Sequence, residues 1–496
     1  MTASEQPRSD PLPLNDSTLA SYTGPAARPA YDRATLKQSI VHIGVGGFHR
    51  AHQAVYLDDL AALGNTEWGE CGVGLRQEDQ RMASVMRSQD RLYTVVTRNA
   101  AEESARVIGS MSSYLFAPAS PSAVLDVLAH EDTRIVTLTI TEGSYKAEPP
   151  TLQEGRRDEE HPGNVFDYLS RALDTRRKTG RPPFTVLSCD NVPNNGEVAK
   201  KAVLSWATSR DTTLARWIEE QVAFPSSMVD RITPQTTDAD RAMVRTAYGI
   251  IDGWPVMTEP FRQWVIQDIF CNGRPPLDDL GVQFVSNVEP YETMKLRLLN
   301  ASHSAMGHLG SLAGYHYIHD VIGDEDFQPF IQRLMDDEVT PLLRAVPGID
   351  LTQYKQTLLE RFRNPKIGDT VERICGKGSD KIPKFILPSL HEAIEQQRPH
   401  RLLTLAVAGW CCYLSGIDDQ KRKITIVDPR ARELRERAIT ARLLSDPRPL
   451  LALHDIFGAL DQHDAFVAEL TQALVSLYTH GVSMTLYRYL YQSGLS

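Results

Sequence analysis

The stretch Ser39-Ile40-Val41-His42-Ile43-Gly44-Val45-Gly46-Gly47 decides the fold of the N-terminal half of the chain. It runs from a short β-rich segment into a glycine turn, and a helical pattern of apolar residues follows over about 50–63. A second apolar run covers 71–75. Strand, glycine turn, helix and strand in this order form a βαβ unit, which implies a parallel sheet.

Further strand patterns follow this unit along the chain. Residues 93–97, 134–140 and 184–189 have the apolar character of buried or half-buried strands and end in polar or turn residues. The charged stretch over 153–163, which also contains proline and glycine, is predicted to be a surface loop.

From about residue 291 onward the pattern is helical almost throughout, and the chain of 496 residues is long enough for two or three domains. We therefore predict an N-terminal extension over 1–36, an α/β Rossmann-type dinucleotide-binding domain over 37–288 and a mainly α-helical C-terminal domain over 289–496. The predicted helices of that last domain cover 294–312, 327–342, 388–395, 401–414, 429–443, 465–479 and 484–491.

The composition argues against several classes of function. The net charge is −10, from 53 basic and 63 acidic residues, which disfavours a nucleic acid or an anionic membrane as the main partner. Six cysteines without a repeated C-x-x-C pattern indicate a reducing compartment. The longest apolar run, about 402–414, is too short to span a bilayer, and no signal peptide is visible. We expect a cytoplasmic protein.

The glycine turn predicts a binding site for a dinucleotide. Gly44, Gly46 and Gly47 let the backbone approach a pyrophosphate, which then lies on the first N–H groups of the helix that includes Phe48. The third glycine of the usual fingerprint is replaced by His49. A tight strand–helix turn without a ligand is the alternative interpretation.

Charged residues beyond the second strand bear on the choice of cofactor. Glu78 and Asp79 could accept hydrogen bonds from ribose hydroxyls, which favours NAD. Arg76 and Arg81 flank them and could instead hold a 2′-phosphate. A solvated charged loop without a ligand is the third possibility, and spacing alone does not decide among them.

The sharpest polar cluster lies in the first predicted helix of the C-terminal domain. On an α-helix, Glu292, Asn300 and His303 fall at about 60°, 140° and 80° from Lys295, so all four share one broad face. A lysine in an apolar site has a lowered pKa and can act as a general base. Asparagine can donate to a developing alkoxide. The alternative is a Glu292–Lys295 helix pair beside a core histidine.

Several motifs together resemble the polyol-specific long-chain dehydrogenase family, and most closely its mannitol 2-dehydrogenase type. They are the G-V-G-G-F-H-R-A-H turn over 44–52, S-C-D-N over 188–191 with Asn195-Gly196, and the K-x4-N-x2-H spacing of Lys295, Asn300 and His303. The segments T-I-T-E-G over 139–143 and F-P-S-S-M-V-D-R over 224–231 also look like family segments. The resemblance covers roughly residues 37–490.

The resemblance implies a metal-independent NAD-dependent alcohol dehydrogenase. It implies that Lys295 is the general base, that Asn191 and Asn300 stabilise the alkoxide, and that His303 orients substrate and lysine. It associates Arg373 and Lys381 with polyol hydroxyls and places Asp230 and Glu292 nearby as charge and proton-path partners. Glu78 and Asp79 match the family's acidic ribose position, which favours NAD.

The predicted reaction is the reversible oxidation of D-mannitol to D-fructose. Another polyol such as D-arabinitol and a hexuronate such as fructuronate or tagaturonate are the alternative substrates, because related enzymes share most of these motifs. An NAD(H)-binding redox sensor is the alternative outside enzymes, although a sensor has no need of a proton acceptor. No metal-ligand motif stands out, and the family resemblance suggests a monomer.

Overall fold

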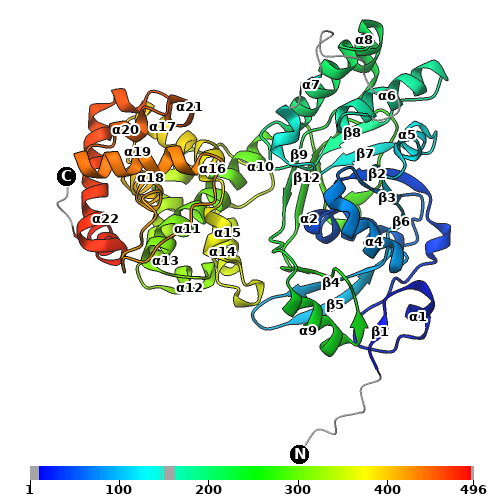
Figure 1. Ribbon diagram of the computed structural model, residues 1–496, viewed down its shortest axis with the longest axis horizontal. Helices are drawn as coiled ribbons and strands as arrows, with labels where there is room; N and C mark the ends of the chain where they lie inside the picture. The colour runs from blue at the N-terminus through cyan, green and yellow to red at the C-terminus, as the bar shows by residue number, and fades with distance from the viewer. Residues whose placement is uncertain (1–9, 147, 150–161, 493–496) are drawn as a thin grey trace, which may run out of the picture. The chain divides into compact units, whose positions relative to one another are not determined.

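The computed structural model describes residues 10–146, 148–149 and 162–492, and most of the predicted loop over 153–163 lies outside them. The chain divides into two compact units, Met1–Val288 and Glu289–Ser496. The first unit mixes strands and helices, and the described elements of the second are helices (Figure 1).

The first unit is built around a five-stranded parallel sheet. The order of its strands, counted along the chain, is 3-2-1-4-5, which is the order of a Rossmann fold and confirms the predicted fold class. The order reverses between the first and fourth of these strands, so their carboxyl ends border the crevice where such sheets bind ligands. Across the sheet the strands are β6 (Met111–Phe116), β3 (Gly69–Gly74), β2 (Gln38–Ile43), β7 (Ile135–Leu138) and β8 (Thr185–Ser188).

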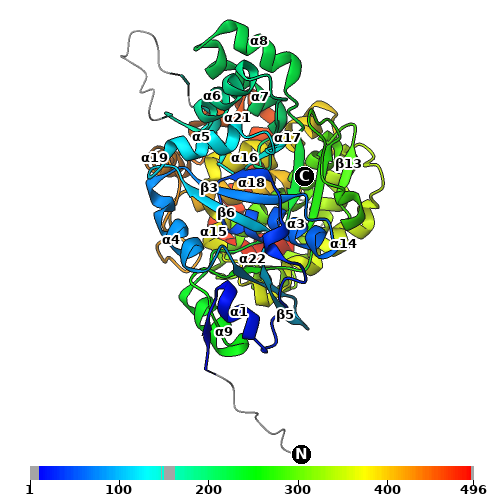
Figure 2. The same cartoon turned by 90° about the vertical axis from the view of Figure 1, so that its right-hand side faces the viewer.

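Helices cover both faces of this sheet, as its nearly continuous apolar strands require. Val41 and Ile43 of β2 share a core with one group of helices, and Ile40, on the opposite face, packs with Tyr56 and Leu57 of α3 (Gln53–Ala62). Figures 1 and 2 both show α6, α7 and α8 grouped together. The helices of the first group are α5 (Pro121–Ala129), α6 (Val165–Lys178), α7 (Asn195–Thr208) and α8 (Thr212–Gln221).

The helical stretch predicted over about 50–63 is confirmed, but a break divides it between two helices. A short α2 (Gly47–Ala51) is separated from α3 at His52, whose φ of −121° and ψ of −83° are not helical. Tertiary contacts hold His52 there: its Nε2 lies 2.8 Å from the carbonyl of Gln263, and its ring packs against Trp264. The apolar period continues across this break, so the sequence pattern does not reveal it.

The first unit also contains two three-stranded sheets and further helices. Of their strands the sequence predicted only β4, because the others are short or show no clear period of two. One sheet contains β11 (Val256–Thr258), β4 (Tyr93–Arg98) and β5 (Glu103–Ile108), and the other contains β13 (Gln283–Val285), β12 (Gln263–Gln267) and β9 (Ser227–Asp230). The further helices include α4 (Gln80–Ser88) and α9 (Asp238–Tyr248).

The N-terminal residues from Asp10 onward differ from the predicted loose extension. Strand β1 (Leu12–Pro13) pairs with β10 (Ile250–Ile251), and α1 (Asp16–Ser21) follows it. Leu14, Leu19 and Tyr22 are buried in the core beside α9, and the Tyr22 hydroxyl donates to the carbonyl of Tyr248 at 2.6 Å. A few well-spaced apolar residues among prolines and serines anchor this segment, although the composition resembles that of a linker.

The second unit is a helical bundle around α18 (Arg401–Tyr413), in which residues 402–413 are buried. This helix packs against α11 (Ala301–Ala313) and α22 (Asp464–Tyr491). The sequence predicted most of the long helices but missed α14 (Leu351–Phe362) and most of the short ones. The other helices are α10 (Glu289–Met294), α12 (Ile318–Gly323), α13 (Phe327–Arg333), α14 (Leu351–Phe362), α15 (Val371–Cys375), α16 (Gly378–Phe385), α17 (Leu387–Glu395), α19 (Ala431–Leu444), α20 (Arg448–Leu451) and α21 (His454–Phe457).

A buried glutamate caps the N-terminus of α18. The carboxylate oxygens of Glu338 accept the backbone N–H groups of Leu402 and Leu403, both at 2.8 Å. Glu338 is only 4% exposed, and burial raises its pKa to about 7. Since the first N–H groups of a helix have no partner within the helix, this side chain satisfies two donors that would otherwise be buried unpaired.

We expect Glu338→Ala to lower the free energy of unfolding by about 1–3 kcal/mol, because two buried N–H groups lose their acceptor. The pKa of Glu338 is higher in the folded chain than its ordinary value of 4.5. Its contribution to stability is therefore complete below about pH 4.5 and is lost as the pH rises through about 7. Glu338→Gln, which stays neutral, should be least stable relative to the parent near pH 5 and should approach or exceed it by pH 8.

Thermal unfolding midpoints between pH 5 and pH 8 check this expectation, with Glu436→Gln on the exposed side of α19 as the control. Parallel curves for the parent and Glu338→Gln would show that Glu338 does not titrate in this range.

Within the part of the chain that the structure describes, we find no helix with the length and apolar character needed to cross a membrane.

Candidate active site

The turn between β2 and α2 has the backbone that a phosphate-binding turn requires. Gly44 has a φ of +99°, and a Cβ at this position would lie 2.2 Å from the carbonyl oxygen of Thr139 at the end of β7. Only glycine fits such a close approach of two backbones. Around Gly46 and Gly47 a Cβ would have no neighbour nearer than 3.8 Å, so the start of α2 keeps open space for a ligand.

The third fingerprint position is filled by a buried histidine instead of a glycine. The ring of His49 stacks on that of His42 at 3.4 Å between centroids, and its Nε2 lies 3.0 Å from Glu70 Oε2. Burial lowers the pKa of His49 to about 3 and raises the pKa of Glu70 to about 7. His49 therefore packs α2 onto the sheet. Phe48, predicted to bind the cofactor, is half-buried with its ring 5.0 Å from that of His52.

A cavity of ≈ 390 Å³ lies at the carboxyl ends of β2, β3 and β7. The phosphate turn forms one wall, and the residues that follow β7, including Thr139 and Thr141, form another. This is the crevice at which a Rossmann sheet binds a dinucleotide. A glycine cradle that a Cβ would fill, a turn opening a helix and a cavity of this size together fit NAD or NADP.

The acidic residues beyond β3 are placed differently from each other. Asp79 lines the cavity, and its Oδ2 accepts the backbone N–H of Arg76 at 2.9 Å, whereas Glu78 is exposed. The Arg76 guanidinium also reaches the cavity wall, where it donates to the carbonyl of Ile140 and to Ser144 Oγ. Asp79 is therefore the better placed of the two carboxylates, and part of Arg76 is already engaged. Arg81, the other flanking cation, lies 4.8 Å from the ring of Trp254.

We expect the double variant Glu78→Gln with Asp79→Asn to shift cofactor preference towards NADP. Two neutral amides remove the repulsion against a 2′-phosphate, while the amide oxygen introduced by Asp79→Asn can still accept the Arg76 N–H. The measurement is the NAD/NADP ratio of kcat/KM. The matched control is Glu131→Gln with Asp132→Asn, an exposed Glu-Asp pair that precedes β7, at the amino end of that strand and so away from the cavity. An unchanged ratio in the first variant would exclude these carboxylates as the ribose determinants.

Asn191 follows β8 in a loop that is firmly tied to its neighbours. The carboxylate of Asp190 accepts the backbone N–H groups of Ile140 and Thr141 at 3.1 and 2.9 Å and the Tyr145 hydroxyl at 2.7 Å. Asn191 itself is exposed, next to this buried anchor. Asp190 thus joins the carboxyl ends of β7 and β8 and fixes the point at which Asn191 leaves the sheet. Asp190 belongs to the S-C-D-N motif over 188–191, but the motif alone did not indicate this anchoring role.

Asp230 is the last residue of β9, where it is 4% exposed. The next residue, Arg231, is also buried and donates to the carbonyls of Ala51 and Glu259. These bonds hold the end of β9 against the end of α2. Asp230 is therefore a fixed buried carboxylate of the first unit.

Lys295 and Asn300 lie in a π-helical turn, so the predicted α-helical face is wrong in its angles. The turn covers Lys295–Asn300 between α10 and α11, and the N–H of Ala301 bonds to the carbonyl of Leu296, five residues earlier. Because the hydrogen bonds of such a turn join residues five apart, Lys295 and Asn300 are separated by a smaller angle about the helix axis than in an α-helix. Lys295 is 7% exposed.

The remaining members of this cluster lie on either side of the π-helical turn. Glu292 is half-buried on α10, and His303 is 6% exposed on α11. Within the described residues, Asn300 Oδ1 is buried and has no hydrogen-bond partner. Inserted π turns of this kind often occur at functional sites.

His303 contacts residues that the sequence did not connect with it. Its Nε2 lies 3.9 Å from Asp369 Oδ2, and its ring centroid lies 4.6 Å from that of Phe362. Asp369 in turn accepts two hydrogen bonds from Arg373. The structure thus joins the predicted residues His303 and Arg373 through a carboxylate that no motif indicated.

Lys381, on α16, belongs to the same neighbourhood. Its Nζ donates to the carbonyl of Ile374 at 2.8 Å. Burial lowers its pKa to about 8, with the nearby charge of Arg373 acting in the same direction. Lys381 can therefore exchange a proton near neutral pH and has N–H groups to offer to a hydroxyl.

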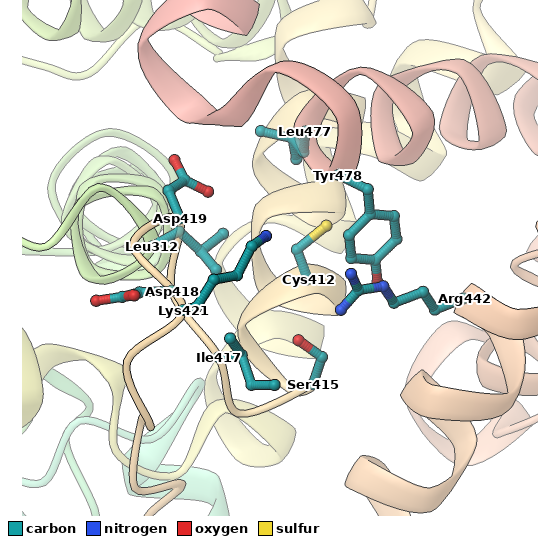
Figure 3. A pocket seen from close by; sticks show the side chains of 10 residues that line it. All are labelled: Leu312, Cys412, Ser415, Ile417, Asp418, Asp419, Lys421, Arg442, Leu477 and Tyr478. Atoms are coloured by element: carbon teal, nitrogen blue, oxygen red, sulfur yellow. The ribbon is translucent and has the colours of Figure 1, made fainter.

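A small cavity in the second unit is unsuited to a polyol (Figure 3). It has a volume of ≈ 30 Å³, which has room for about one water molecule. The side chains around it include Cys412, Lys421 and Arg442, and the Arg442 guanidinium lies 4.6 Å from the ring centroid of Tyr478. None of the predicted site residues lines it.

Comparison with protein-family models gives two matches, one for each part of the chain. Residues 38–279 match the Rossmann domain of mannitol dehydrogenases, and residues 287–478 match the C-terminal domain of mannitol dehydrogenases.

Individual related proteins also match this chain over nearly its whole length. Mannitol 2-dehydrogenase of Aspergillus fumigatus is 44% identical over 97% of this chain and 99% of its own length. The mannitol 2-dehydrogenase of Phaeosphaeria nodorum is 44% identical over 96% of this chain and 86% of its own length. Among solved structures, mannitol 2-dehydrogenase of Pseudomonas fluorescens, a ternary complex with NAD and D-mannitol, is 43% identical with a TM-score of 0.89, covering 97% of this chain and 100% of that one. A substrate-free D-sorbitol dehydrogenase is 32% identical with a TM-score of 0.82, covering 95% and 100%.

Proposed function

Because the chain belongs to the mannitol dehydrogenase family, we propose that it is an NAD-dependent polyol dehydrogenase that interconverts D-mannitol and D-fructose. The observation that carries this proposal is the likeness, over nearly the full chain, to an enzyme solved with NAD and D-mannitol. The buried Lys295 and His303 and the half-buried Asn300 of the π-helical turn and α11 supply chemistry that suits this reaction.

The first unit holds the cofactor in this proposal. Gly46 and Gly47 present backbone N–H groups to the pyrophosphate, while Gly44, whose own N–H bonds to the carbonyl of Val73, lets the backbone turn closely enough. Asp79, with Glu78 beside it, faces the ribose hydroxyls. When bound, NAD supplies the acceptor for the hydride that leaves the carbinol carbon.

The proton is handled by the second unit. Unprotonated Lys295 takes the hydroxyl proton of the substrate, and in the reverse direction its ammonium returns a proton to the ketose oxygen. Asn191 and Asn300 donate hydrogen bonds to the oxygen as it becomes an alkoxide. His303 orients the substrate hydroxyl and the lysine. These assignments follow the family resemblance and agree with the burial of Lys295 and His303.

The other assignments concern the hydroxyl groups on the substrate carbons that do not react. Arg373 and Lys381 donate hydrogen bonds to them, because both retain N–H groups beyond those used within the protein. Asp230 and Glu292 act as charge and proton-path partners. We further propose a cytoplasmic location, which the six unpaired cysteines support, and a monomeric state, which follows the family resemblance.

A substrate panel tests the proposal. Reduction of NAD is followed by absorbance with mannitol, arabinitol, sorbitol and mannonate, and oxidation of NADH with fructose and fructuronate. We expect mannitol and fructose to give the highest kcat/KM. Turnover of mannonate and fructuronate alone would reject the polyol assignment in favour of a hexuronate reductase, and cofactor binding without any turnover would favour a sensor.

A further inference from the structure

An ion pair within the second unit bears on the charge of the substrate. Asp369 is 6% exposed, immediately before Thr370, the residue that caps α15. Arg373 Nε donates to its Oδ1 at 2.6 Å, and an Arg373 terminal nitrogen donates to its Oδ2 at 2.7 Å. This two-pronged geometry is the strongest form of an arginine–carboxylate contact.

The pair lies beside a residue of the proposed catalytic set. Asp369 Oδ2 is 3.9 Å from His303 Nε2. The approach depends on Gly307 of α11, because a Cβ there would lie 2.6 Å from Cγ2 of Ile374 on α15. The close packing of α15 on α11 thus brings the Asp369–Arg373 pair to His303.

The pair changes the charge that this neighbourhood offers to a ligand. Arg373 and Lys381 are the two cations that we assign to the substrate, and Asp369 pairs with the first of them. Arg373 keeps N–H groups for a neutral hydroxyl, since only Nε and one terminal nitrogen bond to Asp369. A carboxylate on the substrate would instead bind the same guanidinium as Asp369, and the two negative charges would repel each other.

We propose that Asp369 is a specificity-determining residue that makes the enzyme favour a neutral polyol over a hexuronate, by committing the charge of Arg373. This inference rests on the proposed function, because it assumes that Arg373 faces the substrate.

The test compares two substrates that differ in one group. Fructuronate is fructose with a carboxylate at C6, so the ratio of their kcat/KM values isolates the effect of that charge. Asp369→Asn keeps the size of the side chain and one acceptor for Arg373 while removing the negative charge. We expect the fructose/fructuronate ratio to fall by at least about tenfold, mainly through a lower KM for fructuronate.

A matched control exists in the same unit. Asp418 accepts a hydrogen bond from Arg422 Nε at 2.7 Å, and the two residues are four apart, like Asp369 and Arg373. The Asp418 side chain is buried, as that of Asp369 is, but the pair is remote from Asp369 in the sequence. Asp418→Asn should leave the ratio unchanged. A folded Asp369→Asn variant that keeps the parental fructose/fructuronate ratio would overturn the inference. If the parent itself turns over fructose, this result would leave the proposed function intact.

A measurement on the parent keeps the inference testable if Asp369→Asn fails to fold. Mannonate is mannitol with one terminal hydroxymethyl group oxidised to a carboxylate. The parent should bind mannonate, measured as a competitive inhibitor of mannitol oxidation, more weakly than it binds mannitol. Tighter binding of mannonate would overturn the inference, whereas absence of any activity on mannitol or fructose would reject the proposed function instead.

Discussion

Lys295→Ala is expected to lower kcat for mannitol oxidation by at least about a hundredfold, because a positioned proton acceptor contributes roughly 10²–10⁴-fold to such a rate. The affinity for NAD should change little, since the phosphate turn belongs to the other unit of the chain. In the parent, oxidation should increase with pH as the acceptor loses its proton. The alanine variant should lack this rise, and a small added amine should restore part of the activity.

Pre-steady-state and steady-state rates across pH check this expectation. Lys423→Ala, which removes an exposed lysine of the same unit, is the control and should retain parental rates. A Lys295→Ala variant with near-parental kcat and an unchanged pH profile would show that this lysine has only a structural role in the π-helical turn.

Loss of an alkoxide-stabilising amide should have an effect of similar size. Asn191→Ala and Asn300→Ala are each expected to lower kcat by about 10²–10³-fold, the range seen when one donor to a developing oxyanion is removed. Because the donation strengthens as the alkoxide forms, kcat should fall more than KM rises.

Asn300→Asp separates this role from a structural one. It preserves the size of the side chain, but a carboxylate beside the reacting oxygen opposes an alkoxide, so its kcat should be at least as low as that of Asn300→Ala. Parental kcat in Asn300→Asp, with an unchanged unfolding midpoint, would contradict the assignment.

The sequence predicted the parts of the fold that depend on local pattern. The strand, glycine turn and following helical stretch around Gly44 were correct because backbone conformation there is set by glycines and apolar periodicity. Most of the long helices of the second unit, although not α14, were predicted for the same reason. The N-terminal segment was misjudged because three anchoring residues, Leu14, Leu19 and Tyr22, carry its packing.

The details of the site depend on contacts that no local pattern encodes. A π-helical turn over Lys295–Asn300 has no period of its own in the sequence, so the relative placement of the two side chains could not be predicted. Asp369 stands outside every motif, and its link to His303 exists only because α15 packs closely on α11. Asp190 and Glu70 were likewise unassigned, since a buried carboxylate is recognised by its partners and not by its neighbours in sequence.

The most direct test of the central claim is a label transfer. D-mannitol carrying deuterium at C2 and C5, which are equivalent by symmetry, is incubated with the enzyme and NAD. The account predicts D-fructose that keeps one deuterium at C5, together with reduced cofactor that carries the other. Absence of fructose, or fructose formed without deuterium in the reduced cofactor, would contradict it.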